Sequence, residues 1–300
     1  MKRRYVTVDV FTDQMFGGNP LAVVLDADGL SASHMQALAI EFNYSETTFI
    51  LPPKQPDHSA LVRIFTPSSE VPFAGHPNVG TAFALATLMA DRNEIVPDEF
   101  VFEEAAGLVP ISLIRNRERV VGAELRAPEQ LSRRGQISHE LAAACLSLNP
   151  EDVRHSMHEP QVLSVGLPFL LVELASRDAL RRAAPSRAGY DRTLPLDGAR
   201  SVYAYTRGEG TIDIYARMFT PRMTEDPATG SATGAAAALI AEFSGQPNTE
   251  VSFRFMQGVE MGRPSLLVAR VRNESDGLTH VYVGGHCVSV MQGTLNLPSE

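Results

Sequence analysis

Hydrophobic residues in this chain fall largely into short runs bounded by turn residues, which is the pattern of β-strands. The first run, residues 5–10, alternates hydrophobic and polar side chains as a strand with one buried face does. An apolar strand is also expected over residues 47–51. Further runs rich in Val, Ile and Phe occur at residues 60–65, 109–114, 251–255 and 266–271.

One segment has the spacing of an amphipathic helix instead. Ser31 is a suitable N-cap, and the periodicity that follows predicts a helix over Ala32–Phe42. The hydrophobic face of this helix is formed by Met35, Leu38, Ala39 and Phe42. By contrast, residues 183–198 are rich in Arg, Pro and Gly, and that composition predicts a surface loop.

The chain also repeats itself. Residues 63–85 overlie residues 217–239 without gaps at an offset of 217 − 63 = 154, and both segments begin Arg-x-Phe-Thr-Pro and end in an Ala-rich stretch. A weaker echo relates the Gly-x-Pro segments at residues 18–24 and 166–172, at an offset of 166 − 18 = 148. Because a repeat on this scale decides the architecture, we interpret the chain as two copies of one domain.

Each copy predicts a strand after Gly-x-Pro, a strand ending at Phe-Thr-Pro, a glycine-containing loop and a helix. The helices, near residues 77–90 and 232–243, are apolar nearly all round, which is typical of helices surrounded by protein. Short strands around such a helix predict a sheet wrapped round a central helix. We place the domain change near Pro128, giving domains 1–127 and 128–300, with the last strand able to pack back on the first.

Composition limits the class of protein. The chain has 300 residues, 44% hydrophobic and 20% charged, which is enough for two globular domains. Its formal net charge is −9 and it has no run of five basic residues, so we expect no nucleic acid partner. No apolar run approaches the roughly 20 residues that cross a bilayer, and the first strand is too polar for a signal peptide. We expect a cytoplasmic protein that does not contact membranes.

Neither the cysteines nor the histidines predict a metal site. Cys145 and Cys287 stand outside any paired metal-ligand spacing, and we expect buried thiols rather than a disulfide. His155 and His158 are three positions apart but have no third ligand nearby, so we interpret them as part of an exposed helix. The sequence predicts no metal and no cofactor.

Candidate chemistry lies where the two central helices begin. A helix N-terminus presents unpaired amides and a partial positive charge, so two such starts facing one cleft would hold a carboxylate. The first loop carries His76, and the second carries Asp226 and Ser231. Taken alone, each of these residues is explained at least as well by a structural or capping role as by catalysis. The copies diverge here into different polar groups, which indicates two halves of one asymmetric site.

Several motifs together resemble the PhzF-like phenazine-biosynthesis family, which has a diaminopimelate-epimerase-like fold. They are FTDQMFGGNPLAV at residues 11–23, NYSETTF at 43–49, RIFTP at 63–67, PFAGHP at 72–77, DPATGS at 226–231 and QGVEMGRPS at 257–265. The resemblance runs nearly end to end. The motifs are highly specific together, although any one would be weak alone.

The resemblance implies an α+β fold of two similar domains, each a mostly antiparallel barrel-like sheet around a central helix, in a homodimer. It implies a cofactor-independent isomerase, similar to trans-2,3-dihydro-3-hydroxyanthranilate isomerase, that moves a proton on a small cyclic carboxylate. The acid/base residue is then Glu46, which the residue pattern alone would not select because a lone glutamate is usually exposed. His76 and Asp226 join it as catalytic residues. The implied substrate-binding residues are Asn19, Gly75, Thr229, Gly230 and Ser231.

The helix-start loops also exclude one activity of the wider fold. Racemases of this fold carry a cysteine at each helix start, whereas the loops here read Ala74-Gly75-His76 and Thr229-Gly230-Ser231. Two alternatives stay open. One is an epimerase that uses Glu46 and Asp226 as bases on opposite faces of its substrate, and the other is a noncatalytic protein that binds small anions. The second loop resembles an uncharacterised branch of the family, so the substrate is left open.

Overall fold

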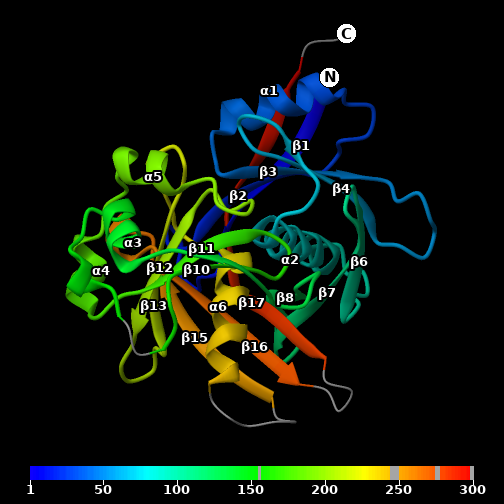
Figure 1. Ribbon diagram of the computed structural model, residues 1–300. Helices are drawn as coiled ribbons and strands as arrows, with labels where there is room; N and C mark the ends of the chain where they lie inside the picture. Colours follow the sequence, from blue (N-terminus) through cyan, green and yellow to red (C-terminus); the bar gives the residue numbers. More distant parts are fainter. Residues whose placement is uncertain (155–156, 244–249, 274–277, 298–300) are drawn as a thin grey trace. The chain divides into compact units, whose positions relative to one another are not determined.

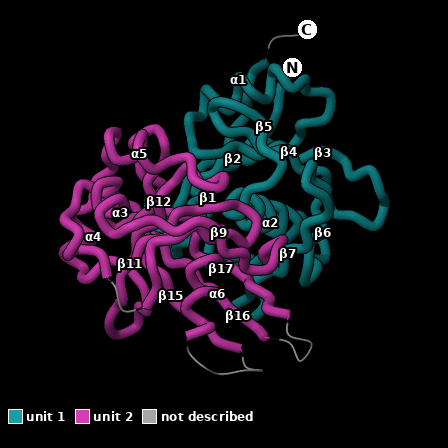
Figure 2. The backbone as a smooth tube through the Cα atoms, in the orientation of Figure 1, with its two compact units in different colours: residues 1–125, 284–300 teal, residues 126–283 magenta. Residues whose placement is uncertain are grey.

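A computed structural model describes residues 1–154, 157–243, 250–273 and 278–297 (Figure 1). The chain divides into two compact units (Figure 2). Unit 1 comprises Met1–Leu125 together with Gly284–Glu300, and unit 2 comprises Arg126–Val283. Unit 1 is therefore discontinuous in sequence, because the end of the last strand belongs to it.

Strands outnumber helices in both units. The helices of unit 1 are α1 (Ala32–Phe42) and α2 (Gly75–Asp91). Its strands are β1 (Lys2–Val10), β2 (Asn19–Val24), β3 (Glu46–Leu51), β4 (Ala60–Phe65), β5 (Glu70–Val71), β6 (Glu99–Glu104), β7 (Gly107–Asn116) and β8 (Arg119–Arg126). The helix α1 has the predicted bounds, the predicted Ser31 N-cap and a buried face formed by Met35, Leu38 and Ala39.

Unit 2 has its strands in a matching order. They are β9 (Ser132–Gln136), β10 (Gln161–Ser164), β11 (Pro168–Glu173), β12 (Val202–Arg207), β13 (Ile214–Phe219), β14 (Glu225–Asp226), β15 (Glu250–Gln257), β16 (Ser265–Asn273) and β17 (Thr279–Asn296), which continues into unit 1. The helices are α3 (His139–Cys145), α4 (Arg177–Arg182), α5 (Arg187–Thr193) and α6 (Gly230–Glu242), with short 3₁₀ turns η1 (Pro150–Asp152) and η2 (Val259–Met261).

Strand pairing repeats step by step between the units. In unit 1, β1 pairs antiparallel with β2, β2 parallel with β3, β3 antiparallel with β4, β4 antiparallel with β5 and parallel with β6, and β6 antiparallel with β7. The strands β10, β11, β12, β13, β14, β15 and β16 of unit 2 follow the same series. The structure therefore confirms two similar units, each a mostly antiparallel barrel-like sheet.

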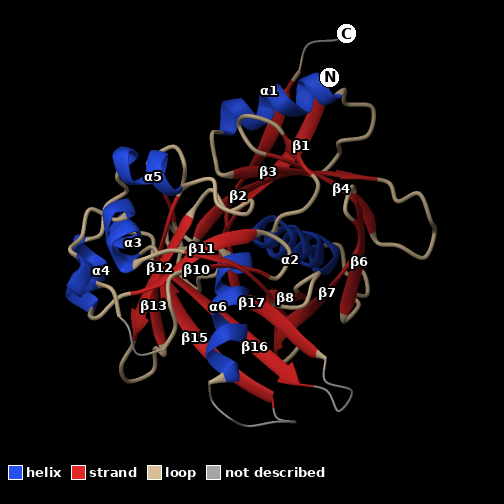
Figure 3. Cartoon of the chain, viewed as in Figure 1, coloured by secondary structure: helices blue, strands red, loops and turns tan. Residues whose placement is uncertain are grey.

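A buried helix occupies the centre of each unit, as the sequence predicts (Figure 3). The helix α2 contacts β1, β2, β3 and β7, and α6 contacts β10, β11, β15 and β16. One threonine on each of these helices is hydrogen bonded within the core, whereas the buried Asn78 side chain of α2 has no hydrogen-bond partner among the described residues. Thr81 on α2 hydrogen bonds Thr48 at 2.8 Å, and Thr233 on α6 hydrogen bonds Tyr203 at 2.9 Å.

An arginine–glutamate pair recurs at the same point of each repeat. Arg63 on β4 bonds Glu70 on β5 through two contacts of 2.7 Å, and Arg217 on β13 bonds Glu225 on β14 through contacts of 2.9 and 2.6 Å. Each guanidinium also lies over the phenylalanine two positions later, at 5.2 Å in unit 1 and 4.8 Å in unit 2. These pairs hold β5 against β4 and β14 against β13, directly before each central helix.

The two repeats differ by one residue in the turn that follows these arginines. In unit 1 the turn is closed between Thr66 and Ser69, and in unit 2 between Thr220 and Thr224. The central helices therefore begin at an offset of 230 − 75 = 155 rather than 154. The ungapped alignment predicted from the sequence is therefore wrong by one position beyond the turn, and His76 corresponds to Ser231.

Two local predictions are wrong. Residues 183–198 are not a plain surface loop, because they contain α5, whose Tyr190 is buried and donates a hydrogen bond to the Phe219 carbonyl at 2.9 Å. His158 does not lie on a helix; it is half-buried, and its Nε2 is 2.6 Å from the Tyr205 hydroxyl. His155 lies outside the described residues.

Other features agree with the sequence. Cys145 and Cys287 are buried free thiols. The edge of unit 1 is closed by β17, which pairs antiparallel with β1 from Lys2↔Asn296 to Val10↔Cys287. Among the described residues, no helix has the length and apolar character needed to cross a bilayer.

Candidate active site

Glu46 is the first residue of β3. The helix α1 ends at Phe42, and the left-handed backbone of its C-cap, Asn43 (φ 53°), turns the chain towards that strand. The parallel pairing of β2 and β3 places Glu46 opposite Leu21, and its side chain is 20% exposed. The glutamate is therefore fixed at a strand end, partly shielded yet open to solvent.

His76 lies in the first turn of α2, only 6% exposed, with its Nδ1 3.5 Å from Oε2 of Glu46. Burial lowers the pKa of the imidazole to about 3, so the ring is neutral at physiological pH and its contact with Glu46 is not an ion pair. Nε2 is also buried and has no hydrogen-bond partner among the described residues. A buried unpaired ring nitrogen is costly, and a bound polar group would satisfy it.

Both central helices begin without a side-chain cap. The N-cap positions of α2 and α6 are Ala74 and Thr229, and neither side chain accepts a hydrogen bond from its helix. Within the described ranges, the four other α-helices are all capped by serine: Ser31, Ser138, Ser176 and Ser186. The space beside Gly75 is open, because an added Cβ would meet no atom within 4 Å. The start of α2 is thus free to accept an anion.

Asp226, Thr229 and Gln257 form a compact network at the start of α6. The Thr229 hydroxyl donates to Oδ2 of Asp226 at 2.5 Å. The buried Gln257 side chain donates to the Asp226 carbonyl at 2.7 Å and accepts from the Thr229 amide at 3.2 Å. Asp226 lies in β14, and the N-cap position of α6 is Thr229. The network orients the carboxylate of Asp226.

Sequence reasoning did not assign a role to Gln257. The signal was its place in the QGVEMGRPS motif, where Gly258 has a positive φ of 74° and lies close to Pro227. A Cβ at Gly258 would come within 2.8 Å of the Pro227 carbonyl oxygen and 2.4 Å of that of Arg263. Only glycine allows this approach, so the motif positions the Asp226 loop.

Asn19 is completely buried at the start of β2, and its Oδ1 accepts a hydrogen bond from Ser45 at 3.2 Å. Ser45 directly precedes Glu46. Asn19 thus fixes the segment that carries the glutamate.

The structure brings the predicted site residues together in two groups. Glu46, His76, Gly75 and Asn19 belong to unit 1, and Asp226, Thr229, Gly230 and Ser231 belong to unit 2. Neither cysteine lies at a helix start, since Cys145 ends α3 and Cys287 is in β17. The described part of the chain contains no group of three His, Cys, Asp or Glu side chains suited to a metal ion.

Known proteins resemble the chain over its whole length. It is 37% identical to trans-2,3-dihydro-3-hydroxyanthranilate isomerase of Pseudomonas chlororaphis, over 98% of this chain and 99% of the relative. It is 36% identical to an uncharacterised isomerase of Mesorhizobium japonicum, over 98% of each chain. Among solved structures, a PhzF-family phenazine biosynthesis protein of Bacillus anthracis superposes with a TM-score of 0.87 at 24% identity, over 99% of this chain and 100% of the other.

The fold extends beyond these relatives. A hydroxyproline epimerase from Agrobacterium vitis has a TM-score of 0.64 at 13% identity, over 98% of this chain and 92% of its own. The protein is therefore an isomerase with a diaminopimelate-epimerase-like fold, as its two similar units and these relatives show. The sequence profile of the phenazine biosynthesis-like proteins (PhzC-PhzF) matches residues 8–293. The chain belongs to this family.

Proposed function

We propose that this protein is a cofactor-independent isomerase that shifts a proton on a small cyclic carboxylate, with Glu46 as the acid/base residue. The observation that carries the proposal is the pairing of the partly exposed Glu46 carboxylate with the buried neutral imidazole of His76, 3.5 Å away. A carboxylate at such a position can take a proton from carbon and return it elsewhere on the same substrate face.

His76 serves this reaction as a neutral group. A protonated imidazole beside Glu46 would hold the carboxylate ionised and weaken it as a base, whereas a neutral ring does not. The unpaired Nε2 supports a hydrogen bond to an amino or hydroxyl group of the substrate. His76 therefore binds and polarises, and the proton itself travels through Glu46.

The substrate carboxylate is assigned to the uncapped helix starts. Unpaired amides at the starts of α2 and α6 suit a carboxylate, and Gly75 and Gly230 are the first residues of these helices. Ser231 would add a hydroxyl donor, and the carboxylate of Asp226 would accept a hydrogen bond from a substrate amino group. That residues of both units act on one substrate molecule follows from the family resemblance and is part of the proposal.

The test of Glu46 compares Glu46→Gln with Glu41→Gln in an assay of trans-2,3-dihydro-3-hydroxyanthranilate conversion. The amide keeps the shape of the side chain but cannot accept the proton, so we expect kcat to fall by about 10²–10⁴-fold with little change in substrate binding. Glu41 is exposed on α1 and its variant should keep full activity. Undiminished turnover by Glu46→Gln would remove Glu46 from the mechanism.

Solvent deuterium separates the remaining alternatives. In D₂O an isomerase labels a new carbon position, an epimerase labels a stereocentre with inversion, and a noncatalytic binder incorporates nothing. Asp226→Asn adds a second comparison. If Asp226 were the opposed base of an epimerase, this variant would stop exchange on one face of the substrate only. The proposed isomerase instead predicts slower turnover with an unchanged labelling pattern.

A further inference from the structure

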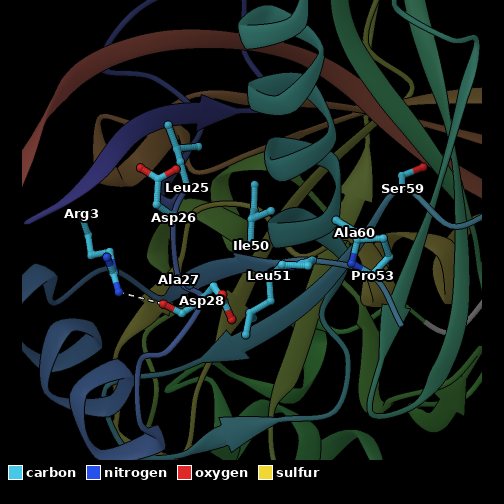
Figure 4. A pocket seen from close by; sticks show the side chains of 11 residues that line it. Arg3, Leu25, Asp26, Ala27, Asp28, Ile50, Leu51, Pro53, Ser59 and Ala60 are labelled. Carbon is cyan, nitrogen blue, oxygen red and sulfur yellow. Dashed lines mark hydrogen bonds between the residues drawn. The ribbon is translucent and has the colours of Figure 1, made fainter. Parts of the chain in front are cut away.

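Duplication has left an equivalent cavity in each unit, next to the carboxyl ends of the paired parallel strands. In unit 1 it lies beyond β2 and β3, has a volume of about 530 Å³ and is lined by residues 25–28, 50–53, 59–60 and Arg3 (Figure 4). In unit 2 it lies beyond β11 and β12 and has a volume of about 520 Å³. Because β2 and β3 correspond to β11 and β12, these are the same cavity in two copies.

The unit 1 cavity is electrostatically balanced. Its charged lining residues are Arg3, Asp26 and Asp28. Asp26 is occupied by Arg4 through two hydrogen bonds of 2.7 Å. Arg3 donates to the Asp28 carbonyl at 2.8 Å, which Figure 4 shows as a dashed line. Arg3 and Arg4 balance Asp26 and Asp28, so this cavity has no net positive charge, although Nε of Arg3 is buried without a hydrogen-bond partner among the described residues.

The unit 2 cavity is lined by four arginines, Arg154, Arg177, Arg181 and Arg207, and only one acidic side chain, Glu209. Arg154 and Arg207 both approach Oε1 of the buried Glu173, at 3.8 and 3.3 Å. Only the 3.3 Å contact of Arg207 is within hydrogen-bond distance, and the buried Oε2 of Glu173 has no hydrogen-bond partner among the described residues. The remaining N–H groups of the two arginines are available to a ligand.

The other two arginines are also incompletely paired. Arg177 lies over the Tyr215 ring at 4.5 Å and bonds Glu260 at 2.5 Å, yet its Nη1 is buried without a partner among the described residues. The side chain of Arg181 has no ion pair or hydrogen bond to a described residue. Counting Glu173, Glu209 and Glu260 against the four arginines leaves a charge of 4 − 3 = +1. A group with several acceptor oxygens would complete this site.

We propose that the arginine-lined cavity of unit 2 binds the phosphate group of a small molecule, at a site separate from the isomerase centre. Guanidinium groups match phosphate oxygens in paired hydrogen bonds, and stacking on Tyr215 fixes the plane of Arg177 for such contacts. The volume lies in the range of small-molecule pockets, roughly 300–1,000 Å³. The proposal does not depend on the reaction at Glu46.

The test measures binding of inorganic phosphate and of glucose 6-phosphate to the full chain by calorimetry, at constant ionic strength set with chloride. Arg181→Gln should weaken phosphate binding about tenfold, and Arg181→Gln with Arg207→Gln about 100-fold. The control Arg117→Gln with Arg119→Gln removes the same two charges from the exposed β7–β8 turn and should change nothing. Arg3→Gln, in the equivalent unit 1 cavity, should also bind normally.

Two outcomes identify the source of the phosphate, and three would overturn the proposal. Tighter binding of glucose 6-phosphate indicates a phosphorylated metabolite, and equal binding indicates phosphate itself. Absence of phosphate binding in the wild type, equal binding by the Arg181→Gln protein, or loss of binding in the Arg117/Arg119 control would each reject the site. Arg181 is exposed and unpaired, so its substitution leaves the fold intact. Ser231→Ala, at the α6 start assigned to the substrate carboxylate, should bind phosphate normally, which separates this site from the proposed isomerase centre.

Discussion

His76 and Glu104 are buried titratable groups of unit 1, and burial favours the neutral form of each. For His76 this lowers the pKa to about 3, and for Glu104, at the end of β6, it raises the pKa to about 8. Asn78 partly offsets the effect on Glu104, although no hydrogen bond of normal geometry joins the two side chains. Their contributions to stability therefore have opposite pH dependence. The His76 contribution is lost as pH falls from 6.5 towards 3, where only the unfolded chain takes up the proton.

Glu104→Gln should stabilise the protein at neutral and alkaline pH. The unfolded chain loses the Glu104 proton above its ordinary pKa of 4.5, whereas the folded protein keeps it up to about pH 8. Wild-type stability must fall across that window, and an amide cannot ionise. At pH 7 the gain should be about 3 kcal/mol, measured by urea unfolding. Glu99→Gln, exposed on the same strand, should follow the wild-type pH curve; parallel curves for all three proteins would contradict the assignment.

At the scale of the elements, the sequence predicted what is repeated and periodic. The bounds of α1 and β4 were read directly from hydrophobic spacing, and the apolar composition of α2 and α6 indicated that both are central. The one-residue difference between the repeats was not visible, because alanines and glycines align almost as well in either register. Residues 183–198 were predicted to be a loop because α5, which starts after Ser186 and buries Tyr190, is too short to show a periodic pattern of hydrophobic residues.

The candidate site was only partly predictable from the sequence, because its residues have no characteristic local pattern. Glu46 and His76 lie far apart in sequence, and nothing local distinguishes a glutamate at a strand start from an exposed one. The prediction that these two residues belong to one site came from the motifs that the chain shares with the family. Gln257 was missed because a buried amide that bonds two backbone groups has no characteristic spacing in sequence.

The duplicated arginine–glutamate pairs offer a matched measurement of burial. Arg63 and Glu70 are 27% and 39% exposed, whereas Arg217 and Glu225 are 10% and 12% exposed. Glu225→Gln leaves a buried guanidinium without its full partner and should destabilise the protein by about 3 kcal/mol. Glu70→Gln, at the same place in the other repeat, should cost less than about 1 kcal/mol. Equal losses in thermal or urea unfolding would show that burial does not set the difference.

At the scale of the whole molecule, the two units differ in continuity. Unit 2 is one stretch, Arg126–Val283, but unit 1 needs Gly284–Glu300 to complete it. The β1–β17 pairing supplies the partner of β1 on the side away from β2. The homodimer and the cytoplasmic location implied by the sequence stay predictions, which light scattering and cell fractionation can address.

Truncation after Val283 should therefore affect the units unequally. Without the last strand segment, β1 has an open edge and residues 1–125 should become sensitive to trypsin, while residues 126–283 survive as a resistant fragment. Mass spectrometry of the digest identifies the fragment. A control that ends at Leu297 keeps the β1–β17 pairing and should resist digestion throughout. If both units of the truncated chain stay resistant, β17 is dispensable for unit 1.

The discontinuity of unit 1 also delays its folding during translation. Residues 1–125 leave the ribosome first, but they must wait for residues 284–297 before their sheet can close. Unit 2, in contrast, forms from one continuous stretch and is complete once Val283 has emerged. The nascent amino-terminal half, including Glu46 and His76, is thus expected to depend on chaperones or on its own residual structure until residues 284–297 have emerged.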